Sequence, residues 1–227
     1  MPRAALLRHL FRVWLLCLCS GGAAAQVALL DSAEALLERG EVSRAESVIN
    51  QAARHDTTAA LPRTWYLRAF VYKELLKNTA DSATYEARRR AGLTSIDVGT
   101  RLDPEGKYAD RHRALRDYLL ATLYNQGIDA FNAQRYPAAL RLFEQLLARR
   151  EAVTNDTLLS ETHYHAAWAA LMNLDSAAAQ THFEQALALG YRSSFLYERL
   201  ASLYHDAPRR AGRLLVEGRS LFPDALN

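Results

Sequence analysis

Apolar residues recur three and four positions apart along nearly the whole chain after residue 26, which is the spacing of one face of an α-helix. Proline and glycine are sparse and lie between these periodic segments, and no stretch alternates apolar and polar residues for long enough to predict a strand. The pattern therefore predicts an all-α fold. The expected helices cover residues 27–37, 42–52, 62–77, 82–101, 107–133, 137–150, 158–172, 176–189, 194–205 and 208–222, with polar linkers at 55–60 and 151–157.

Short polar side chains precede several of these segments, where they can accept hydrogen bonds from the first turn of a helix. Gly190 is expected to end a helix, since glycine readily adopts the left-handed conformation found there. The expected N-caps are Asp81 or Ser82, Asp175, Ser193 and Asp206.

Small residues recur at regular positions within the helices. The segment from Ala139 to Phe143 returns forty residues later as the segment from Ala179 to Phe183. Two helices approach closely only where the facing side chains are small, so these positions are expected to be helix crossings. The crossing residues of the first helices are Ala33, Ala69, Gly127, Ala167 and Ala201, and those of the second helices include Ala139 with Phe143 and Ala179 with Phe183.

This pattern resembles the tetratricopeptide repeat, whose unit is a pair of antiparallel helices. The resemblance implies an all-α, right-handed solenoid of about five helical hairpins, with units at about 26–59, 62–104, 107–150, 158–190 and 194–223. The intervals between equivalent small residues, 32 to 47 residues, depart from the family's 34. Leu146 also stands where the family has a small residue, and the second unit carries an insertion around 78–90.

Residues 1–25 have the pattern of a signal peptide. Basic residues come first, a short apolar stretch follows, and Ala23-Ala24-Ala25 provides a signal-peptidase site, so cleavage is expected before Gln26. The chain is then exported to the periplasm or cell envelope. An uncleaved membrane anchor is the alternative, because residues 13–30 carry no charge. A lipid anchor on Cys17 or Cys19 would need a small residue before the cysteine, and leucine stands there in both cases.

Composition excludes several classes of function for the rest of the chain. The leader holds three of the 28 basic residues and none of the 25 acidic ones, which leaves 25 of each after Gln26 and gives no reason to expect a nucleic-acid partner. Both cysteines lie in the leader, so thiol chemistry is not expected. No catalytic or phosphate-binding motif is present, and we expect no enzyme activity and no cofactor. His163 and His165 point about 200° apart on a helix and are not expected to share a metal ion.

The resemblance also implies a concave groove lined by the first helix of each hairpin, where related proteins hold peptides. Residues three or four apart share a helix face, and on these helices that face is aromatic and nearly uncharged. The alternative is that the same rings pack between neighbouring hairpins. The groove candidates are Tyr66, Phe70, Lys73, Tyr124, Asn125, Ile128, Phe131, Tyr164, Trp168, Met172 and Arg199.

Taken together, these features predict a non-catalytic scaffold or adaptor that binds a protein or peptide. One alternative is an outer-membrane assembly factor resembling the tetratricopeptide lipoproteins, associated with the membrane through an envelope partner. Another is a small-molecule-binding or enzymatic helical domain, and a third is a spacer with an empty groove. The basic run Arg88-Arg89-Arg90 is expected to form a solvated face paired with Glu86 and Asp97.

Overall fold

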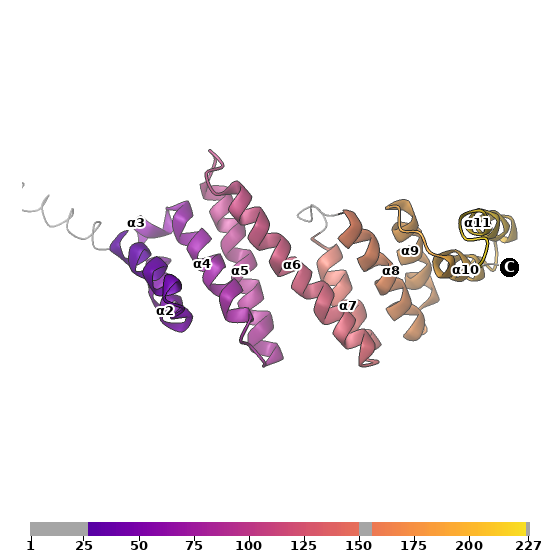
Figure 1. Cartoon of the computed structure of the whole chain (residues 1–227), viewed down its shortest axis with the longest axis horizontal. Coiled ribbons are helices and arrows are strands. Elements are labelled where there is room, and N and C mark those ends of the chain that lie inside the picture. Colours follow the sequence, from indigo (N-terminus) through magenta and orange to yellow (C-terminus); the bar gives the residue numbers. More distant parts are fainter. Residues whose placement is uncertain (1–26, 150–155, 226–227) are drawn as a thin grey trace, which may run out of the picture. The chain divides into compact units, whose positions relative to one another are not determined.

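A computed structural model describes residues 27–149 and 156–225, and the predicted leader lies outside them. The described residues contain helices and no strand. A helix over residues 27–38 comes first. The others are α2 (Val42–Ala52), α3 (Asp56–Ala59), α4 (Pro62–Leu76), α5 (Ser82–Leu102), α6 (Ala109–Asn132), α7 (Tyr136–Leu147), α8 (Asp156–Met172), α9 (Ser176–Ala188), α10 (Ser194–Leu203) and α11 (Pro208–Leu221) (Figure 1).

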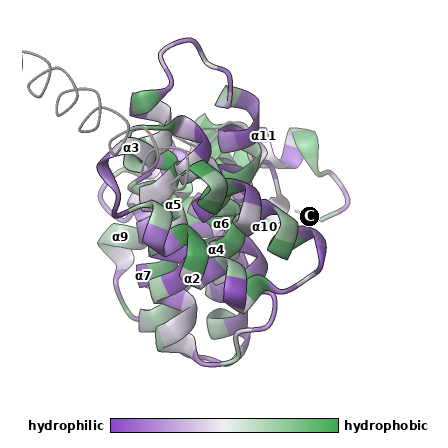
Figure 2. Ribbon diagram, turned by 90° about the vertical axis from the view of Figure 1, so that its left-hand side faces the viewer, coloured by the Kyte–Doolittle hydropathy of each residue, from purple (hydrophilic) through white to green (hydrophobic). Residues whose placement is uncertain are grey.

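The helices form two compact units, Met1–Leu119 and Leu120–Asn227, and α6 begins in unit 1 and ends in unit 2. Successive helices are joined by short turns into hairpins, such as α4 with α5, α8 with α9, and α10 with α11. Each helix carries hydrophobic and hydrophilic stretches side by side, as expected when one face is buried (Figure 2). The prediction of an all-α fold built of such hairpins is confirmed for the described residues.

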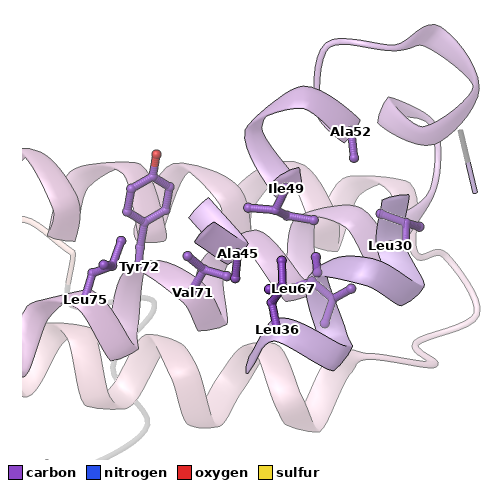
Figure 3. Packing of buried hydrophobic residues seen from close by; sticks show 10 residues of the cluster. Leu30, Leu36, Ala45, Ile49, Ala52, Leu67, Val71, Tyr72 and Leu75 are labelled. Carbon is purple, nitrogen blue, oxygen red and sulfur yellow. The ribbon is translucent and has the colours of Figure 1, made fainter. Parts of the chain in front are cut away.

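The core of unit 1 lies where the helix over 27–38, α2 and α4 meet (Figure 3). Leu30, Ala45 and Ile49 are fully buried, and Leu67 is 3% exposed. The small residue Ala45 lets α2 approach its neighbours closely, while the branched residues fill the space around it. Burying each of these larger side chains stabilises the fold by about 1.5–3 kcal/mol relative to leaving it exposed.

One arginine connects three helices of unit 1. The Arg68 Nε on α4 donates to the Asn50 Oδ1 on α2 at 2.8 Å, and its Nη1 donates to the Ser95 Oγ on α5 at 2.7 Å. The guanidinium also lies 4.8 Å from the ring centre of Tyr72. The planar fork of donors in arginine allows one side chain to satisfy groups on both neighbouring helices.

Two glycines of α5 allow α6 to pack closely against it. A β-carbon at Gly92 would lie 2.8 Å from the Leu119 Cδ1, and one at Gly99 would lie 2.7 Å from the His112 Nε2. Any larger side chain would have to displace these neighbours, so the long α5 carries glycine despite its cost within a helix.

In unit 2 the small residues and rings form two neighbouring clusters. Gly127 lies against the Phe143 ring in one, and Phe183 packs with Ala167 in the other. The structure buries the crossing residues named above: Ala69, Ala139, Phe143, Ala167, Ala179 and Phe183 are 0% exposed, Ala201 is 7% exposed, and Gly127 is buried.

The helix ends agree with most of the predicted caps. The carboxylate oxygens of Asp81 and Asp175 accept from the backbone N–H of Thr84 and Ala178, and the Ser193 hydroxyl accepts from that of Leu196. Gly190 has a φ of 88° just beyond α9.

The Asp206 prediction is wrong. Helix α11 begins after Ala207, with no side-chain hydrogen bond at its cap, because the proline at position 208 provides the first turn with a fixed φ and no N–H to satisfy.

Two further expectations need correction. The linker at 55–60 contains the short helix α3, whose Thr58 is fully buried and donates its hydroxyl to the Ala52 carbonyl at 2.5 Å. In the basic run, Arg90 pairs with Glu86 as expected, but Arg89 is 3% exposed. Asp97 instead pairs with Arg116 of α6 at 3.1 Å. The run is therefore divided between the surface and the interior of unit 1, because the helix turns successive residues to different faces.

Candidate functional site

The structure gathers aromatic side chains from α4 and the first part of α6 on one face of unit 1. The Tyr66 ring centre lies 6.3 Å from that of Phe70 on the same helix and 5.5 Å from that of Tyr108, in the turn just before α6. Further along both helices, the Lys73 ammonium lies 5.4 Å from the ring centre of Tyr118. Because Arg111 contacts Tyr66 and the later Tyr118 contacts the later Lys73, this part of α6 runs parallel to α4.

Cations lie over these rings. The Arg111 guanidinium is 5.3 Å from the ring centre of Tyr66 and 5.7 Å from that of Tyr108, and the Lys73 ammonium is 4.9 Å from that of Phe70. Such cation–π contacts hold long side chains flat against an aromatic surface. We call this set the unit 1 face: Tyr66, Phe70, Lys73, Tyr108, Arg111 and Tyr118.

The unit 1 face is partly open to solvent and not balanced in charge. Tyr118 is 38% exposed, and Tyr66 and Phe70 are half-buried. Lys73 pairs with Glu74 at 2.6 Å. Arg111, in contrast, has no carboxylate within ion-pair distance among the residues that the structure describes. A surface of rings with an unpaired guanidinium suits a ligand that is apolar in one part and anionic in another.

Sequence reasoning placed Tyr66, Phe70 and Lys73 together but missed the α6 half of this face. Tyr108, Arg111 and Tyr118 belong to a segment that the repeat pattern does not cover, because it lengthens the helix that enters the next hairpin. Their spacing of three and then seven residues is helical, and that periodicity was the one available signal.

A buried histidine lies behind the unit 1 face. His112 is 1% exposed, and neither of its ring nitrogens has a hydrogen-bond partner among the described residues. Burial lowers the pKa of His112, although the nearby Asp103 carboxylate acts in the opposite direction. His112 is therefore held as a neutral ring in the fold.

In unit 2, Tyr124 is tied into packing. Its hydroxyl lies 3.3 Å from the His165 Nδ1, and its ring packs edge-on against that histidine at 5.6 Å and near the Phe143 ring at 6.0 Å. Burial, followed by the neighbouring Glu161 carboxylate, raises the pKa of Tyr124 to about 12.

The next pair of predicted rings also contacts the interior of unit 2. Tyr164 stacks on Tyr191 with ring centres 4.3 Å apart, and Trp168 packs edge-on against the buried Phe183 at 6.0 Å. The Arg199 guanidinium covers the outer side of Trp168 at 5.6 Å.

The remaining unit 2 candidates divide between packing and solvent. Ile128 and Phe131 pack against the core cluster, with Phe131 edge-on to Tyr136 at 5.4 Å. Met172 is 48% exposed, and Asn125 is exposed. Half-buried rings that contact the core leave less free surface in unit 2 than the aromatic pattern alone suggests.

A hollow of about 320 Å³ lies between α9, α10 and α11. The carboxylates on its wall are already engaged: the Tyr204 hydroxyl donates to Glu184 at 2.5 Å, and the Tyr197 hydroxyl donates to Glu217 at 2.7 Å. Burial raises the pKa of Tyr204 and Tyr197 to about 12, so both hydroxyls stay protonated as donors at neutral pH. These two hydrogen bonds join α10 to α9 and to α11.

Comparison with known proteins gives only distant likenesses. No family model matches the chain, and no curated protein matches it. Among solved structures, it is similar to a chain of the APC/C hetero-tetramer Cut9–Hcn1, with 17% identity and a TM-score of 0.41 over 88% of this chain and 40% of that one. It is also similar to PilF of Pseudomonas aeruginosa, with 17% identity and a TM-score of 0.34 over 86% of this chain and 76% of that one. The type IV pilus biogenesis factor PilW is similar with 14% identity and a TM-score of 0.38 over 89% of this chain and 96% of that one.

The chain thus spans less than half the length of the first of these structures. Likenesses this distant leave the function to be inferred from the chain's own residues.

Proposed function

We propose that this chain is a non-catalytic scaffold or adaptor that binds a protein or peptide, and that the unit 1 face is the place where the partner docks. The observation that carries the proposal is the gathering of Tyr66, Phe70 and Tyr108 on one face, with the Arg111 guanidinium over Tyr66 and Tyr108. Aromatic rings and arginine are the side chains most often found at the energetic centre of protein interfaces.

The chemistry of the face indicates the kind of segment it binds. Tyrosine and phenylalanine rings provide apolar area at a low cost in side-chain entropy, since each has only two rotatable bonds. Arg111 provides a fork of donors for a carboxylate, and Lys73 adds a point charge beside it. A peptide carrying an aliphatic or aromatic residue next to an acidic one therefore fits this face better than a basic or uniformly polar one.

The predicted leader supports a place in the periplasm or cell envelope for this activity. Among the residues that the structure describes, no helix is long and apolar enough to cross a membrane. N-terminal sequencing of the protein from the envelope fraction tests the location: a start at Gln26 supports export and cleavage, and a start at Met1 in a detergent-dependent protein contradicts them.

Site-specific photocrosslinking in native cells tests the docking face. A benzophenone amino acid replaces Phe70 in one variant and the exposed Thr94 of α5 in a matched control. We expect a discrete adduct from position 70, none from position 94, and loss of the adduct when Arg111→Glu is added. Equal adducts from both positions, or none from position 70 in a folded protein, would contradict the proposed face.

A further inference from the structure

Two histidines of unit 2 meet across the α8–α9 hairpin. His163 lies on α8 and His182 on α9, and their Nδ1 atoms are 3.0 Å apart. The ring centres are 5.3 Å apart, with the planes tilted by 45°. His165, the neighbour that the sequence suggests as a partner for His163, instead directs its Nδ1 toward the Glu161 carbonyl at 2.9 Å and toward Tyr124.

The two imidazoles face each other through the same ring nitrogen. Two neutral imidazoles can share one hydrogen, with one Nδ1 donating and the other accepting. A neutral imidazole nitrogen is the form that binds a metal ion.

We propose that His163 and His182 bind a divalent transition-metal ion through their Nδ1 atoms, bridging the two helices of this hairpin. Two nitrogens at 2.0–2.1 Å from a tetrahedral ion lie about 3.3 Å apart, close to the separation already present. In the metal-free fold the nitrogens face each other at hydrogen-bond distance, so binding rotates each ring outward and replaces the shared hydrogen. Both side chains are half-buried, which leaves a path for the ion and for water.

The site would provide two protein ligands. Among the described residues, no group of three or more histidine, cysteine or acidic side chains is placed to hold a metal. The remaining positions on the ion are therefore open to water. Imidazole ligands favour Cu²⁺, Ni²⁺ and Zn²⁺, whereas Mg²⁺ prefers oxygen, so the expected order of affinity is Cu²⁺, then Ni²⁺ and Zn²⁺, with no binding of Mg²⁺.

Thermal unfolding of the full chain tests this site. An ion that binds only the folded state at about 100 times its Kd should raise the Tm by about 5–10 °C. We expect this rise with CuSO4, NiCl2 and ZnCl2, its reversal by EDTA, and no rise with MgCl2. His163→Gln and His182→Gln should each abolish the rise, and His165→Gln, the matched control on the same helix, should keep it.

If a variant is less stable without metal, its Tm alone does not report on metal binding, and a spectroscopic measurement is needed. The electron paramagnetic resonance spectrum of the Cu²⁺ complex should show coupling to two nitrogens in the unaltered chain and a weaker pattern in His182→Gln. The absence of a Tm rise in the unaltered chain overturns the proposal. So does an equal rise in His182→Gln, or a Cu²⁺ spectrum that this substitution leaves unchanged.

Discussion

Gly127 lies directly against the ring of Phe143, with no space for a β-carbon between them. Within a helix, replacing glycine by another residue gains about 1 kcal/mol of helix propensity. Here the added side chain would have to displace a ring that is fully buried. Overpacking typically costs about 1–3 kcal/mol, so the contact outweighs the propensity.

Gly127→Leu should therefore lower the free energy of unfolding by about 1–2 kcal/mol, measured by urea denaturation. Gly212 of α11 is the matched control, because a β-carbon there would meet nothing within 4 Å. Gly212→Ala should stabilise the chain by up to about 1 kcal/mol. If Gly127→Leu were stabilising as well, the close crossing of α6 and α7 would be wrong.

The buried neutral His112 predicts a dependence of stability on pH. The pKa of His112 is lowered in the fold, whereas the unfolded chain has the ordinary value of about 6.5. The unfolded state therefore binds the proton first as pH falls. The stability is fully present above about pH 6.5 and is lost as pH falls toward the folded pKa, with a slope of at most about 1.4 kcal/mol per pH unit for one proton.

The substitution His112→Leu isolates that effect. It removes two buried nitrogens without partners among the described residues, so it should be neutral or stabilising at pH 7.5. Urea denaturation between pH 5 and 7.5 should show a flatter profile than in the unaltered chain, with the contribution of His182 remaining. An unchanged profile would mean that His112 is protonated equally in both states.

Trp168 distinguishes packing from ligand binding in unit 2. Because it lies edge-on to the buried Phe183, Trp168→Ala should cost about 2 kcal/mol and lower the Tm by about 4–8 °C. Met172→Ala on the same helix should change stability by less than about 0.5 kcal/mol, since Met172 is 48% exposed. If Trp168→Ala left the Tm unchanged, Trp168 would again be a candidate for lining a ligand groove.

Asp175 and Asp206 both precede a helix, but only Asp175 caps one, so their replacement should have different effects on stability. Asp175→Ala should cost about 1 kcal/mol, because the carboxylate accepts from the Ala178 N–H at the start of α9. Asp206→Ala should cost less than about 0.5 kcal/mol, because α11 begins after it without a side-chain cap. Chemical denaturation of the two variants compares them directly, and equal costs would contradict the placement of the α11 start.

The helices could be predicted from the sequence because their cause is local. The spacing of Ala139 with Phe143 and of Ala179 with Phe183 reflects the period of a helix, and the caps lie next to the turns they stabilise. The contacts between helices could not be predicted in the same way. Nothing local to His163 indicates that it meets His182 and not His165, because the choice depends on the rotation of α9 against α8.

For the same reason, the sequence could not predict which residue of a charged run is buried. Arg88, Arg89 and Arg90 are chemically alike, and only the packing around α5 decides that the middle one is enclosed. The unit 1 face shows the same limit. Its α4 half follows from helical spacing, whereas Tyr108 and Arg111 join it because the turn before α6 and the first turn of α6 pack against α4.

The three-way contact of Arg68 has a consequence for how this chain could be rearranged. Repeat proteins are often treated as interchangeable modules that can be duplicated, deleted or exchanged. Here the N-terminal hairpin completes the hydrogen bonds of an arginine that belongs to the next one, and a residue of α5 completes them on the other side. A transplanted α4–α5 hairpin would leave that guanidinium without its Asn50 partner, so in this part of the chain the smallest exchangeable module is two hairpins.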